Sequence, residues 1–113
     1  MAKTIPIPSP KVSVTGSVST SGLSKEGKIT VVTIDDVSWT ALPASALADR
    51  NQINIQNESG VEIKVNHVVA PDPGYVGIII PDGGERQYGI KDSIIIYARA
   101  QAGTVNIEVE ELS

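Results

Sequence analysis

Residues able to do acid–base or metal chemistry are few in this chain. His67 is the only histidine, and there is no cysteine. A single imidazole excludes a multi-histidine metal site and leaves at most one histidine base. His67 shares strand parity with Val61, Ile63 and Val65, so we interpret it as a strand-terminal residue and not as a catalyst. No G-x-S-x-G motif is present to supply a nucleophile.

Paired carboxylates occur twice, at Asp35-Asp36 and at Glu110-Glu111. Neighbours along a strand point to opposite faces, so neither pair can face one substrate together. Acidic residues in the expected turns lack the D-x-D spacing of a calcium loop, which makes calcium a weak alternative. We therefore predict a protein that is not an enzyme, with no catalytic residues, no cofactor and no metal site.

Charge and hydropathy narrow the classes of partner. The chain of 113 residues has 9 basic and 13 acidic residues, a formal net charge of −4. This acidic balance repels a phosphate backbone, so we expect no nucleic-acid partner. The longest aliphatic runs fall far below the roughly 20 residues needed to cross a bilayer. The first residues lack the apolar core of a signal peptide, so we expect neither a membrane span nor secretion by that route.

Composition and patterning favour strands. Isoleucine (15) and valine (13) far outnumber leucine (4), and β-branched side chains suit pleated strands. Alternating apolar residues between turn signals predict strands over residues 28–34, 52–56, 61–65, 75–80, 86–90, 93–99 and 105–109. The turns NESG and PDGG predict two hairpins, joining 52–56 to 61–65 and 75–80 to 86–90. The predicted fold is all-β: one antiparallel β-sandwich or barrel of jelly-roll or immunoglobulin-like size.

The stretch WTALPASALADR interrupts this alternation between the first two strands. Pro43 fits the first turn of a helix and is followed by several alanines, so we predict a short helical crossover near 43–49. Trp39 and Leu42 are bulky enough to plug an open end of the fold. The alternative is that Trp39, Leu42 and Arg50 contact a partner.

Residues 1–28 differ from the β-domain predicted over 29–113. Prolines at alternate positions enforce an extended backbone and remove hydrogen-bond donors, so this segment cannot be an interior strand. Its valines alternate weakly and suit strand addition to a partner, but they are too few to order the segment alone. We predict an extended arm that binds a partner through Ile5, Pro6, Ile7, Pro8, Pro10, Val12, Val14 and Val18.

The pieces WTALPASALADRNQINIQNESGVEIKV, IIIYARA and VNIEVEELS, in this order, resemble small β-rich structural proteins of tailed-bacteriophage virions. The resemblance covers about Ile29 to Ser113 and implies a non-enzymatic role in head decoration or cementing. A collar, tail or fibre-attachment component is the alternative within that class. The implied partner is the major capsid protein or another virion subunit, and the implied location is the virion, assembled in the host cytoplasm.

Other classes of function stay open at this point. A ligand-binding module could recognise glycan through Trp39 or the turn tyrosines, and an enzyme built on His67 with a nearby carboxylate is the weakest hypothesis. A small domain with a long arm gains most from symmetric partners, so we expect a homo-oligomer, with a trimer as the first choice.

Overall fold

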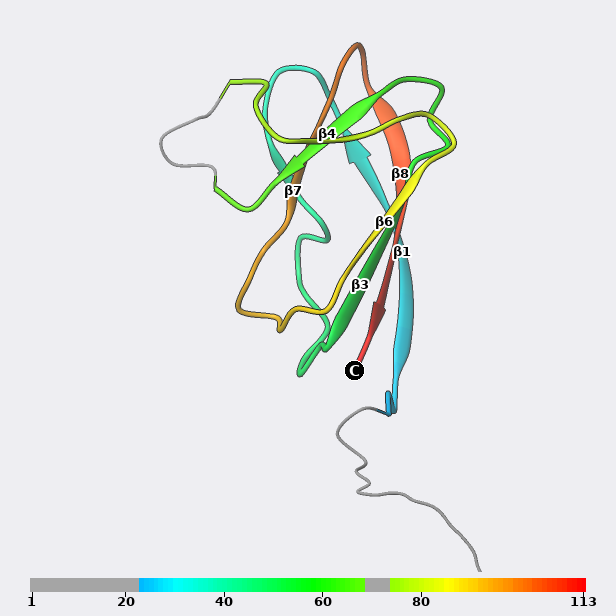
Figure 1. The fold of residues 1–113 in the computed structure, drawn as a ribbon, viewed down its shortest axis with the longest axis vertical. Coiled ribbons are helices and arrows are strands. Elements are labelled where there is room, and N and C mark those ends of the chain that lie inside the picture. The colour runs from blue at the N-terminus through cyan, green and yellow to red at the C-terminus, as the bar shows by residue number, and fades with distance from the viewer. Residues whose placement is uncertain (1–22, 69–73) are drawn as a thin grey trace, which may run out of the picture.

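The computed structural model of the chain describes residues 23–68 and 74–113. Over these residues the fold is an all-β sandwich of two four-stranded antiparallel sheets, as predicted (Figure 1). The first sheet has the order β1 (Gly27–Ile34), β8 (Val105–Leu112), β3 (Gln52–Gln56) and β6 (Glu85–Tyr88). The second has the order β2 (Thr40–Ala41), β7 (Tyr97–Ala100), β4 (Ile63–Asn66) and β5 (Ile78–Ile80).

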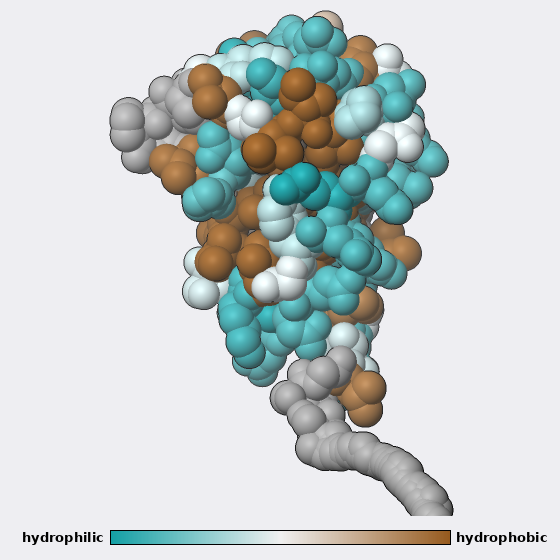
Figure 2. Space-filling model, in the orientation of Figure 1, coloured by the Kyte–Doolittle hydropathy of each residue, from teal (hydrophilic) through white to brown (hydrophobic). Residues whose placement is uncertain are grey.

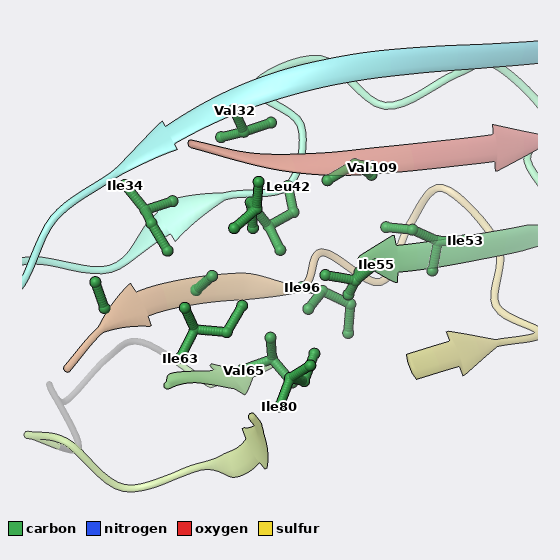
Figure 3. Packing of buried hydrophobic residues seen from close by; sticks show 13 residues of the cluster. Val32, Ile34, Leu42, Ile53, Ile55, Ile63, Val65, Ile80, Ile96 and Val109 are labelled. Carbon is green, nitrogen blue, oxygen red and sulfur yellow. The ribbon is translucent and has the colours of Figure 1, made fainter. Parts of the chain in front are cut away.

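A core of aliphatic side chains lies between the two sheets. The period-2 alternation of the sequence places every second residue of β3, β4 and β8 inside. Each fully buried isoleucine or valine stabilises the fold by about 1.5–3 kcal/mol. Figure 3 shows these side chains converging from both sheets, and the buried set is Val32, Ile34, Leu42, Ile53, Ile55, Ile63, Val65, Ile80, Ile96, Ala98, Ala100, Ile107 and Val109.

Both predicted hairpins are wrong. β3 and β4 belong to different sheets, and so do β5 and β6, so NESG and PDGG are turns that cross the sandwich. β6 pairs with β3 instead of β5. The two crossing turns bind each other: Asn57 N donates to Gly84 O at 2.9 Å and Gly83 N donates to Asn57 O at 2.6 Å. Backbone bonding between the turns replaces the ladder that a hairpin would have formed.

The predicted helical crossover near 43–49 is also wrong, because this segment forms bends and a turn. Its amide groups donate to distant side chains and not to carbonyls one helical turn earlier. Leu47 N donates to Glu111 Oε2 at 2.9 Å, and Asp49 N donates to Asp92 Oδ2 at 3.1 Å. Asp49 has φ of 58°, in the left-handed region, which a right-handed helix excludes.

Four strands are shorter than predicted: β4 and β6 by one residue each, and β5 and β7 by three residues each. β5 begins at Ile78 because residues 74–77 turn away to cover the second sheet, and β7 begins at Tyr97. Ile94 and Ile95, expected in a strand covered on both sides, are exposed, while Ile96 is buried. Alternation therefore located the strands more reliably than it located their ends.

Backbone hydrogen bonds to the C-terminal residue are also present just before β1. Lys25 N and Glu26 N both donate to Ser113 O, and Ser113 N donates to Glu26 O at 2.9 Å. These bonds extend the β1–β8 ladder past Gly27. The residues predicted to bind through the arm, from Ile5 to Val18, lie outside the described residues.

Candidate functional site

Trp39 and Leu42 have different surroundings. Leu42 is buried in the core, and its N–H donates to Ile96 O at 2.8 Å. Trp39 is half-buried, and its indole Nε1 donates to Gly74 O at 2.9 Å. A Cβ placed on Gly77 would lie 3.3 Å from the Trp39 ring, so the ring packs against the 74–77 segment. The only tryptophan thus fixes a loop and has its polar atom engaged inside the molecule.

Arg50 is buried and forms an ion pair with Glu111, the last inward-facing residue of β8. Arg50 Nη1 lies 2.9 Å from Glu111 Oε2, with the two side chains 1% and 0% exposed. Arg50 Nη2 donates to Lys91 O at 3.0 Å and to Ile94 O at 2.6 Å. One guanidinium therefore joins the crossover, β8 and the 91–94 loop, which is a structural role and leaves no free surface for a partner.

A second set of polar side chains fastens the 74–77 segment over the second sheet. Lys64 Nζ donates to Tyr75 O at 3.0 Å and lies 4.4 Å from the centre of the Tyr75 ring. Tyr75 Oη donates to Glu62 Oε2 at 3.2 Å. Partial burial, followed by this contact with Glu62, raises the pKa of Tyr75 to about 12. Arg99 Nη1 donates to Gly74 O at 3.1 Å beside the indole.

Asp35 follows the last residue of β1 and begins the crossover. Its Oδ1 accepts hydrogen bonds from Ser38 N at 3.0 Å and Val37 N at 2.9 Å. These backbone bonds, that from Ser38 first, lower the pKa of the Asp35 carboxyl below its ordinary value. The adjacent Asp36 accepts from Gly103 N at 3.0 Å on its own side chain, so the paired carboxylates serve two separate turns.

His67 is exposed and lines a cleft of about 200 Å³ between the sheets, together with Val65, Ile78, Tyr88 and other residues. Across residues 23–68 and 74–113, no group of three or more His, Asp or Glu side chains is placed to hold a metal ion. The same ranges contain no helix that is long and apolar enough to span a bilayer. Among the described residues that line this cleft with His67 there is no serine, threonine, aspartate or glutamate.

Aliphatic side chains gather at β5, an edge strand that pairs only with β4 among the described strands. Val76 is 65% exposed, and Ile78 and Ile79 are each about half exposed. Figure 2 shows hydrophobic surface over this strand, bordered by hydrophilic residues. We call Val76, Ile78 and Ile79 the β5 patch.

The outer face of the first sheet carries two rows of side chains that run across the strands. The first row is Ile29, Glu110, Asn54 and Gln87, and the second is Val31, Glu108, Gln56 and Glu85. Within the first row, Asn54 Nδ2 donates to Glu110 Oε1 at 2.6 Å. A groove of about 380 Å³, which we call the outer groove, is lined by Ile29, Asn54, Gln56, Glu85, Gln87, Glu108 and Glu110.

Sequence reasoning did not identify the outer groove or the β5 patch. Glu108 and Glu110 alternate with the inward residues of β8, which marks them as one face, but their neighbours depend on strand order. Since β3 and β6 were assigned to hairpins, their amides and Glu85 could not be placed beside β8. The sequence carries no direct signal for which strands pair, and the outer groove can be recognised only once that pairing is known.

The chain matches no protein-family model and no curated protein.

Proposed function

We propose that this chain is a non-enzymatic structural protein of a tailed-bacteriophage virion. Its β-sandwich body binds a larger virion subunit, while residues 1–22, which precede the described body, run across a neighbour. The observation that carries the proposal is the β5 patch: exposed aliphatic side chains on a short edge strand and just before it, surrounded by polar residues. Clustered apolar surface with a polar border favours a protein contact over a solvated face.

The polar side chains of the body support a binding role of this kind. Arg50, Tyr75 and Arg99 each bond within the body, where they position loops. The Trp39 indole N–H donates to Gly74 O, so this group is already bonded within the molecule and does not point to a glycan ligand. Body contact through the β5 patch, combined with strand addition by the arm, supplies many weak contacts that particle symmetry repeats. The major capsid protein is the partner we propose first, and a collar or tail subunit is the alternative.

Incorporation into particles tests the proposal. Phage particles that lack their own copy of the chain are grown in host cells that supply a variant, and copies per particle are counted by quantitative mass spectrometry. We expect the Val76→Thr/Ile79→Thr variant to be incorporated at least about tenfold less than the wild type, because threonine keeps the branch at Cβ and removes apolar contact. The matched control is Val37→Thr, an equally exposed valine in the turn after β1.

Two results would overturn the proposal. One is the absence of the wild-type chain from purified particles. The other is incorporation of the Val76→Thr/Ile79→Thr variant at the level of the Val37→Thr control, with circular dichroism showing that both are folded.

A further inference from the structure

The first sheet has one long edge that no described strand covers. Within the described residues β1 pairs with β8 alone. In the N-terminal part of β1, from Gly27 to Val31, every residue except Thr30 is exposed. Ile29 and Val31 are 69% and 59% exposed, and both side chains lie on the outer face. An edge of this kind presents unpaired backbone groups that accept an added strand.

The outer groove lies directly beside this edge. It begins at Ile29 and continues over Glu108 and Glu110 of β8 to Glu85 on β6. In the part of the chain that the structure describes, the one ion pair is Arg50–Glu111, on the inner side of the sheet. No described cation therefore neutralises the three carboxylates of the groove, and an occupant bearing positive charge gains from them.

Residues 1–22 of the sequence have the complementary composition. They contain Lys3 and Lys11 and no acidic residue, so all 13 acidic residues lie in the rest of the chain. Val12, Val14 and Val18 alternate in the manner of an added strand, and valine pairs well with β-branched neighbours across strands. Both features of the acceptor, the aliphatic edge and the acidic groove, thus have a counterpart in this segment.

We propose that residues 1–22 of a second copy of this chain dock on the first sheet. Residues 12–18 add to the free edge of β1 beside Ile29 and Val31, and residues 3–11 cross the outer groove with their lysines toward its carboxylates. The inference rests on the proposed function, because it names the neighbour that the arm crosses.

Chain length is sufficient for this path. Four strands spaced about 4.8 Å apart span about 14 Å. Residues 3–11, extended by their prolines, reach about 25 Å at about 3.1 Å per residue. The segment therefore crosses the groove with length to spare.

The last described residues before β1 direct the chain away from its own acceptor. Ser24 Oγ donates to Asn51 Oδ1 at 3.3 Å, and Lys25 N and Glu26 N donate to Ser113 O. Asn51 precedes β3, so the chain leaves the sheet on the β8 and β3 side and not along the free side of β1. Docking between copies joins two different surfaces, which makes it a heterologous contact.

Site-directed disulfide formation tests the contact, since the natural chain has no cysteine. Full-length Val14→Cys chain is mixed with full-length Ile29→Cys or Val31→Cys chain under mild oxidation. We expect a two-chain product at least about tenfold more abundant than with Val76→Cys, a valine of similar exposure just before β5. Yields equal to this control for both edge positions would overturn the proposal.

The Val14→Cys/Val31→Cys double variant separates the second copy from the same chain. Products of two or more chains that increase with concentration are expected. A concentration-independent, single-chain disulfide would overturn the assignment to a second copy.

Sedimentation of the unmodified full-length chain provides an independent measurement. We expect concentration-dependent association that weakens about tenfold for Glu85→Gln/Glu108→Gln and at high salt, as screening of exposed charges requires. A monomer at every concentration would overturn the proposal. These measurements use the purified chain alone. A negative result in them does not contradict incorporation into virions, and a loss of incorporation does not contradict association between copies.

Discussion

The Arg50–Glu111 pair is the contact that holds the crossover against β8. Glu111→Gln keeps the shape of the side chain but leaves a guanidinium buried without its counter-ion. We expect this variant to lower the free energy of unfolding by about 3 kcal/mol, because an unpaired buried charge is costly. Urea denaturation measures it, with Glu108→Gln on the outer face as the control, expected within about 0.5 kcal/mol of the wild type. Equal effects for the two variants would contradict the structural role of the pair.

Tyr75 gives the fold a dependence on alkaline pH. Its pKa is raised from 10.0 to about 12, first by burial and then by Glu62. A raised pKa means that the folded state holds the proton more tightly, so the stabilisation is complete below pH 10 and disappears as pH rises from 10 to 12. Ultraviolet titration should show a tyrosine ionisation near pH 12. Tyr75→Phe should remove this ionisation, and its persistence in the variant would contradict its assignment to Tyr75.

The strands and turns show what the sequence determines and what it leaves open. Alternation of Ile53 with Ile55, and of Ile107 with Val109, located β3 and β8 because burial on one face has a period of two residues. The dihedral preferences of NESG and PDGG located the turns but carried no information on which sheet the next strand joins. That choice depends on a contact between residues distant in sequence: the buried Asn57 side chain donates a hydrogen bond to Ile80 O. The outer groove follows from strand order and was hidden for the same reason.

Asn57 should therefore hold the two crossing turns together. Its Nδ2 donates to Val61 O at 2.8 Å and to Ile80 O at 2.9 Å. Asn57→Ala removes the amide donor from the buried Ile80 O and the amide acceptor from Ser59 N and Oγ, and we expect a loss of about 2 kcal/mol in the free energy of unfolding. The control is Asn106→Ala, which removes only an exposed contact with Thr33 and should change stability by less than about 0.5 kcal/mol. Similar values for both would argue against a special role for the buried amide.

The 74–77 segment depends on a glycine at its closest approach to β4. A Cβ at Gly77 would lie 2.5 Å from Val65 O. Gly77→Ala should displace the segment, lower the free energy of unfolding by about 1–3 kcal/mol and shift Trp39 fluorescence to longer wavelength as the indole loses its packing. Gly89→Ala is the matched control, because the nearest atom to its added Cβ lies at 3.9 Å and its backbone is unstrained. A fluorescence maximum unchanged by Gly77→Ala would show that Trp39 does not depend on this segment.

At the scale of the whole molecule, we expect the described body to be stable without residues 2–22. Every buried core residue of the described ranges lies between Val32 and Val109, so deletion of residues 2–22 should change the free energy of unfolding by less than about 0.5 kcal/mol at low protein concentration. Deletion of residues 2–26 also removes the bonds of Lys25 and Glu26 to Ser113, and should cost about 1–2 kcal/mol.

The dependence of stability on protein concentration shows whether residues 1–22 act within one chain or at a contact between chains. Docking between copies stabilises the folded state by mass action, so the full-length chain should gain stability as its concentration rises, while the chain lacking residues 2–22 should not. Thermal melts of both chains over a wide concentration range provide the comparison. Parallel curves at every concentration would mean that residues 1–22 contribute nothing to association between copies, whereas curves that diverge only at high concentration place their effect at the contact between chains.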